Sequence, residues 1–135
     1  MALQDAIEKV QDLAGVVSGI RAAPDYLPES LNIFPFLVCY AGTGSFEYSP
    51  AGVMKGLHNI ILELHVARHD LPRDVKNVMQ YSDSIPKALM ADPTLGGVVS
   101  TIGRITYTFG GMQYGDQMTL GFRFTLEGVK LQTTI

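Results

Sequence analysis

The sequence is poor in charge, has one cysteine and has no tryptophan. Charged residues make up 17% of its 135 positions, below the ~25% usual in soluble domains. Lys and Arg number 10 against 13 Asp and Glu, and no basic block occurs, which argues against a phosphate-binding surface. The single Cys39 has no partner for an internal disulfide, as is typical of a reducing compartment. Its apolar neighbours favour a buried structural thiol.

Long apolar runs and leader-like segments are also missing. The longest uncharged stretch, Ser30 to Phe46, contains Pro35, Gly42 and Gly44, so it is not expected to cross a bilayer as a helix. Acidic residues near the start argue against a signal peptide: Asp5, Glu8 and Asp12.

Motifs for metal, cofactor or catalytic chemistry are not found, and we expect no cofactor and no enzyme activity. His65 and His69 are four residues apart, but four residues of a strand span roughly 13 Å, too far for one metal ion. Gly42-Thr43-Gly44 follows a strand, yet Glu47 stands at the third glycine position of a dinucleotide loop, so a turn is expected. No G-x-S-x-G elbow or GxxxxGK[ST] loop occurs.

Aromatic residues in the last third of the chain are the one feature that suggests nucleic-acid stacking. Tyr107, Phe109 and Tyr114 are interleaved with polar residues. A stacking platform needs a cationic track beside its aromatics, and these segments have few basic residues. Core or interface packing is therefore the preferred interpretation.

Hydrophobic periodicity predicts one α+β domain over residues 1–135, with a mainly antiparallel sheet and two main helices packed on one face. The predicted order is helix, three strands, helix, two strands: 2–14, 36–41, 45–49, 57–68, 70–91, 98–109 and 118–130. Asp70 is expected to cap the second helix, and Pro86 to kink or split it, with Ser84 recapping the second half. In strand 57–68 one face is apolar and the other is mixed and polar.

The charge deficit is concentrated in two segments, the uncharged stretch Ser30 to Phe46 and the stretch from Pro93 to Phe122. Between Pro93 and Phe122 only Arg104 and Asp116 are charged, so two strands and their hairpin loop are nearly uncharged on both faces. Such strands pair readily with other chains, which predicts self-association. Isolated cations on these and neighbouring strands are candidates for contacts between subunits: Arg68, Arg104 and Arg123.

Two glycine-containing loops are candidate docking elements, namely Ser49–Gly56 and Gly110–Asp116. Both are expected to be long and mobile, because glycine permits many backbone shapes. Tyr48, Gly111 and Tyr114 are the interface residues expected at these loops. Two ordinary surface loops remain the alternative.

The order of elements and several short strings, over roughly residues 2–130, resemble the tail terminator (tail completion) proteins of long-tailed, siphovirus-type bacteriophages. Each string is common alone, and only their order and spacing carry the resemblance. They are the opening amphipathic helix, Leu27-Pro28 through Phe34-Pro35-Phe36-Leu37-Val38, Ala41-Gly42-Thr43-Gly44-Ser45, Leu64-His65-Val66, Asp70-Leu71 and Ala88 to Gly97 before the last hairpin.

The resemblance implies a structural role in the virion, at the head-proximal end of the tail, after assembly in the host cytoplasm. Such proteins form hexameric rings that cap the tail tube, stop its polymerisation and present a surface to the head-side connector or stopper protein. Genomic DNA passes through the lumen. With a formal charge of −3 per chain, carboxylates rather than Lys and Arg are expected to line the hole, because cationic contacts would hold DNA.

Other functions remain open on the residues alone. Another head–tail connector or a tail tube subunit has similar size and the same need for subunit contacts. A small-molecule-binding α+β domain would need a pocket with convergent polar groups, and no such set can be assembled from this sequence. No membrane partner is expected.

Overall fold

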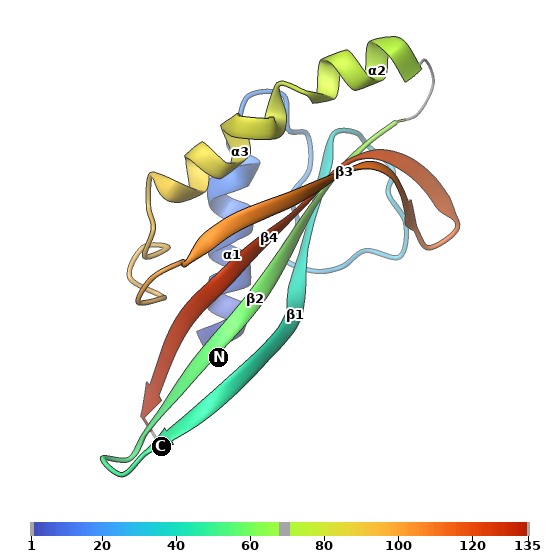
Figure 1. Cartoon of the computed structure of the whole chain (residues 1–135). Helices are drawn as coiled ribbons and strands as arrows, with labels where there is room; N and C mark the ends of the chain where they lie inside the picture. The colour runs from blue at the N-terminus through green and yellow to red at the C-terminus, as the bar shows by residue number, and fades with distance from the viewer. Residues whose placement is uncertain (1, 68–70, 135) are drawn as a thin grey trace.

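The computed structural model describes residues 2–67 and 71–134 and contains one four-stranded antiparallel sheet with helices on one face (Figure 1). The sheet order is β1-β2-β4-β3, so the last strand lies between β2 and β3. The predicted α+β class with one antiparallel sheet is confirmed, and so is the order of elements apart from the two differences described below. The elements are α1 (Ala2–Gly15), β1 (Phe36–Ser49), β2 (Val53–Val66), α2 (Leu71–Val78), α3 (Tyr81–Met90), β3 (Arg104–Tyr114) and β4 (Gln117–Thr134).

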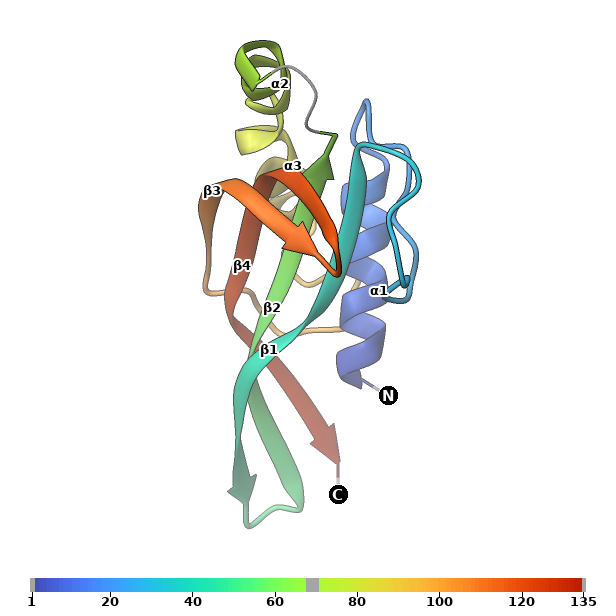
Figure 2. The same ribbon diagram turned by 90° about the vertical axis from the view of Figure 1, so that its right-hand side faces the viewer.

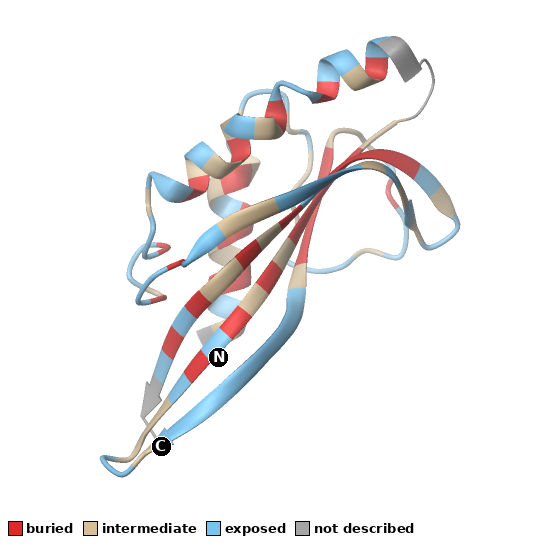
Figure 3. Cartoon of the chain, in the orientation of Figure 1, coloured by how far each residue is buried: buried red, intermediate tan, exposed pale blue. Residues whose placement is uncertain are grey.

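The main core lies between the helices and one face of the sheet. All three helices contribute to it, for example through Val10 of α1, Val78 of α2 and Ile85 of α3. They pack on strand residues that alternate along the sheet, such as Leu62 and Phe122, both fully buried. We call this the helix face, and the opposite side the outer face. Figure 3 shows the alternation of buried and exposed residues along β2 and β4.

The first two predicted strands form one continuous strand, so the turn predicted at Gly42-Thr43-Gly44 is wrong. Instead, the β1–β2 register shifts between Ala41 and Gly44. The extra residue is accommodated as an irregularity of the ladder, and Asn59 Nδ2 donates to Thr43 Oγ1 at 3.0 Å beside it. Beyond this point β1 and β2 extend past the helices as an exposed arm (Figures 1 and 2).

Both predicted loops are in fact tight hairpin turns. β1 ends at Ser49 and β2 begins at Val53, and Gly52, with φ +79°, donates its N–H to Ser49 O at 3.0 Å. β3 runs to Tyr114, so only Gly115 and Asp116 connect it to β4. The mobile loops predicted for 49–56 and 110–116 are therefore mostly strand.

The second helical segment divides earlier than predicted. α2 ends at Val78 and α3 begins at Tyr81, while Pro86 lies inside α3. Ser84 does not recap a helix but donates its hydroxyl to Gln80 O at 2.7 Å. β3 likewise begins at Arg104, six residues after the predicted start, because residues 94–99 form turns. The predicted cap Asp70 lies outside the described residues.

The β3–β4 hairpin curls over the outer face of the sheet (Figure 2). There its tip meets the segment that joins α1 to β1, and a small second core forms around Leu31, Phe36 and Val38, with Tyr114 packed against it. Gly121 of β4 stands between Gly110 of β3 and His65 of β2, and a Cβ atom there would collide with the carbonyl oxygen of Leu64. In residues 2–67 and 71–134, no helix has the length and apolar character needed to span a membrane.

Candidate subunit-contact surfaces and a buried polar cluster

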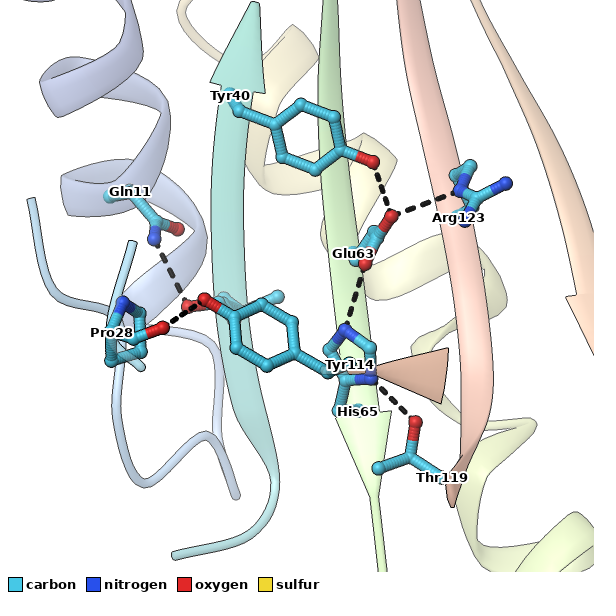
Figure 4. A network of polar contacts seen from close by, with 9 residues as sticks. Gln11, Pro28, Tyr40, Glu63, His65, Tyr114, Thr119 and Arg123 are labelled. Carbon is cyan, nitrogen blue, oxygen red and sulfur yellow. Dashed lines mark hydrogen bonds and ion pairs between the residues drawn. The ribbon is translucent and has the colours of Figure 1, made fainter. Parts of the chain in front are cut away.

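The outer face of the sheet holds a buried polar cluster centred on Glu63 of β2 (Figure 4). The Glu63 carboxylate, 4% exposed, accepts a hydrogen bond from Tyr40 of β1. It also pairs with Arg123 of β4 at 3.0 Å and with His65 Nε2 at 2.9 Å. The other ring nitrogen of His65 lies 2.6 Å from Thr119 Oγ1. Three neighbouring strands are thus tied together by one carboxylate.

The cluster shifts the acidity of its members. Burial alone would raise the pKa of Glu63, but hydrogen bonds from His65 and Tyr40, the charge interaction with His65 and the hydrogen bond from Arg123 lower it to about 2. Burial, together with the hydrogen bond to Glu63 and its negative charge, raises the pKa of Tyr40 to about 12. Glu63 therefore remains ionised at neutral pH, which is the state that the donors around it require.

A second set of contacts fixes the tip of the β3–β4 hairpin. Gln117 bonds the backbone of Leu31 twice, accepting from its N–H at 2.5 Å and donating to its carbonyl at 2.7 Å. The Tyr114 hydroxyl donates to Pro28 O. The Tyr114 ring meets the His65 ring edge-on, with centroids 5.6 Å apart. The tip therefore covers the polar cluster and orders residues 28–31.

Thr119, His65 and Glu63 are linked by hydrogen bonds in the order in which a catalytic triad places its nucleophile, its base and the carboxylate that orients the base. Thr119 is 1% exposed and His65 is fully buried, so no substrate reaches the hydroxyl in this arrangement. We conclude that the cluster is a structural tie. Within the described ranges, no group of three or more His, Cys, Asp or Glu side chains is placed to hold a metal ion.

Both edges of the sheet are open over long stretches with few charges. β3 pairs with β4 on one side, and no described residue bonds its other edge. On β1 the first residues are covered, because Leu37 N donates to Ala22 O at 2.8 Å. From Cys39 to Tyr48, however, the outer edge has no backbone partner in the described part of the chain. Open, β-prone edges with few charges are sites of strand addition.

Exposed apolar side chains gather near these edges. Tyr107 and Phe109 of β3 are 59% and 36% exposed, and Phe46 and Tyr48 of β1 are 61% and 71% exposed. The rings of Tyr107 and Phe109 contact the ring of Phe122, with centroids 5.5 and 4.9 Å apart. On the open edge of β3, however, no neighbouring strand of the described chain covers them. Apolar groups in this setting are typical of surfaces that a partner covers.

The predicted interface residues fall into three groups. Tyr48 and Gly111 lie on the edge strands β1 and β3. Tyr114 and Arg123 belong to the contacts of the outer face, and Arg104 pairs with Glu127 at 3.4 Å. Arg104 and Arg123, the predicted interface arginines that the structure describes, therefore have ion-pair partners within the chain. Arg68, and His69 of the rejected metal pair, lie outside the described residues.

The polar cluster was not found from the sequence, although part of its signal is present. Glu63 and His65 alternate with Leu62 and Leu64 on a strongly apolar strand, which places them together on the second face. The tip of the β3–β4 hairpin covers this cluster, and the local pattern of β2 does not predict that contact between distant segments. The open edges, in contrast, follow from the charge deficit.

Comparison with known proteins adds no assignment: no protein-family model matches the sequence, and no curated protein is significantly similar to it.

Proposed function

We propose that this chain is a structural subunit of the tail terminator type, which forms a closed ring, with six copies as the expected number, at the head-proximal end of a phage tail tube. The observation that carries the proposal is the pair of open edges, with few charges, on one four-stranded sheet. Two different edges that complement each other support head-to-tail contacts, which close into rings when the rotation between copies allows.

The remaining features agree with a role in assembly. The exposed arm of β1 and β2 extends past the helices (Figure 1) and offers a surface to a tail tube subunit or to a head-side connector. The buried cluster on the outer face holds the strands together without offering a reactive group at the surface. A ring of this kind performs its task by geometry: it ends the tube and leaves a passage for DNA.

The expected partners follow from this role. They are further copies of the chain, the tail tube protein and the head-side connector or stopper, in the virion and in the host cytoplasm during assembly. DNA would pass the lumen without sequence-specific contacts, and Lys- and Arg-rich walls in a structure of the ring would contradict this part of the proposal.

Light scattering and negative-stain images of the purified protein test the function. Closed rings of uniform diameter are expected. Open filaments would instead indicate a tube subunit, because a terminator must not continue the polymer. A monomer whose melting temperature rises with a small metabolite would indicate a ligand-binding domain. Added to polymerising tail tube subunits, a terminator is expected to shorten the tubes in proportion to its concentration.

A further inference from the structure

Beside the open edge of β1 lies a mostly apolar hollow of about 380 Å³. Its apolar walls are Leu3 and Ile7 of α1, Cys39 and Ala41 of β1, and Leu27 of the α1–β1 connection. The exposed residues Gln4 and Asp25 also line it and make part of its rim polar. The hollow lies where α1 covers the helix face of the sheet but no further strand follows β1.

The opposite edge of the same sheet has apolar side chains with no cover. Tyr107 and Phe109 stand opposite Phe124 and Phe122 in the β3–β4 register, so they share the helix face with these core residues. They remain 59% and 36% exposed because β3 is the last strand. Between Ile105 and Tyr114 this strand has no charged residue, so no charge opposes its burial.

We infer that β3 of one copy adds to the open edge of β1 of the next copy, and that Tyr107 and Phe109 fill the hollow beside that strand. The inference rests on the proposed ring and names the contact that builds it. The occupant of the hollow is thus a second copy of this chain. Each copy supplies one edge with exposed aromatic side chains and one edge with a mostly apolar hollow, which suits an aromatic side chain.

Strand direction and face are both consistent with this pairing. All neighbours in the order β1-β2-β4-β3 are antiparallel, so β3 runs antiparallel to β1. In a ring whose rotation axis runs along the strands, β1 points in the same direction in every copy. β1 of the next copy is therefore antiparallel to β3 of the first copy. The same rotation keeps all helix faces on one side, which brings Tyr107 and Phe109 to the side of Cys39 and Ala41.

Cysteine cross-linking between two different variants tests the contact. In a Cys39→Ala background, Ala41→Cys is placed on one copy and Tyr107→Cys on another, and a short thiol cross-linker is added. Cross-linked dimers are expected in the mixture and in neither variant alone, because the edges that meet are different. The double variant is expected to give a ladder of higher oligomers. Thermal melting of each variant must match the background, which confirms that it is folded.

Thr108→Cys serves as a control for the face of the strand, because Thr108 is next to Tyr107 but points to the outer face. Mixed with Ala41→Cys it is expected to give at least tenfold less cross-link. A second measurement needs no cysteine. Tyr107→Ser is expected to raise, at least tenfold, the protein concentration at which half of the chains are assembled. Val16→Ser, which alters a residue that is 81% exposed at the end of α1 and outside both surfaces, is expected to leave that concentration unchanged.

The outcomes separate this contact from the proposed function. Cross-links in Tyr107→Cys alone would show β3 pairing with β3 and overturn the inference, as would cross-links in Ala41→Cys alone. Rings without a mixed cross-link would overturn the contact and leave the ring function standing. A mixed cross-link in filaments would uphold the contact and contradict the terminator function. A protein that stays monomeric at all concentrations, with no cross-link, would overturn the contact.

Discussion

Replacement of Glu63 by glutamine removes the negative charge at the centre of the polar cluster on the outer face. The pKa of this carboxyl falls from an ordinary value of 4.5 to about 2 in the folded chain. That difference corresponds to about 3 kcal/mol of stability. Because the folded pKa is the lower one, the contribution is fully present above pH 4.5 and is lost as the pH falls toward 2. Glu63→Gln is therefore expected to lose about 3 kcal/mol at pH 7.

Urea unfolding followed by circular dichroism measures this effect at a series of pH values. The gap between wild type and Glu63→Gln is expected to be constant from pH 7 to 5 and to close between pH 4.5 and 2, where the wild type is protonated. Glu47→Gln, an exposed substitution on β1, serves as the matched control and is expected to stay within about 0.5 kcal/mol of wild type. Equal urea midpoints for wild type and Glu63→Gln at pH 7, or a gap that persists at pH 2, would refute the reasoning.

Four further outcomes are expected. Phe122→Ala removes the buried aromatic side chain on which Tyr107 and Phe109 rest and should lower the free energy of unfolding in urea by about 3–5 kcal/mol. A loss under 1 kcal/mol would contradict the burial of Phe122. Gly121→Ala places a Cβ against a backbone carbonyl of β2 and should cost about 1–3 kcal/mol, so wild-type thermal stability would argue against this close approach of β4 to β2. Tyr114→Phe loses the bond that the hydroxyl donates to Pro28 O and should cost about 1 kcal/mol, with faster amide exchange in residues 28–31 as the local readout. Burial raises the pKa of the Cys39 thiol to about 12, so it should react with a disulfide reagent far more slowly in the native chain than in urea, and equal rates would contradict the burial.

The sequence predicts the class of the fold well because its strongest signals are periodic. The alternation of Ile60, Leu62 and Leu64 identifies the helix face of β2, and these residues are fully buried. The first helix was placed within one residue of its observed end. Both results depend on local patterns that the tertiary structure reinforces.

Glycines caused the largest errors in the predicted boundaries. Gly42 and Gly44 are typical of a turn, yet β1 continues through them because β2 supplies a partner on the other side of the irregularity. Gly110 and Gly111 were assigned to a loop for the same reason, although β4 pairs with both. Local propensity is a weak guide where a long neighbouring strand offers a continuous ladder. The candidate contact surfaces were predictable in kind, from the missing charge, but not their pairing, which depends on the hollow beside β1.

The position of β4 has a consequence for the order of events during synthesis. It is the last of the described elements to leave the ribosome, yet it occupies a central place between β2 and β3. Until residues 117–134 emerge, β3 has no strand to pair with, and one edge of β2 is unpaired. Gln117 must also reach back to Leu31, 86 residues earlier, before the α1–β1 connection is ordered. A nascent chain therefore lacks the paired β3 edge until residues 117–134 have emerged, and its sheet depends on long-range contacts, which form slowly.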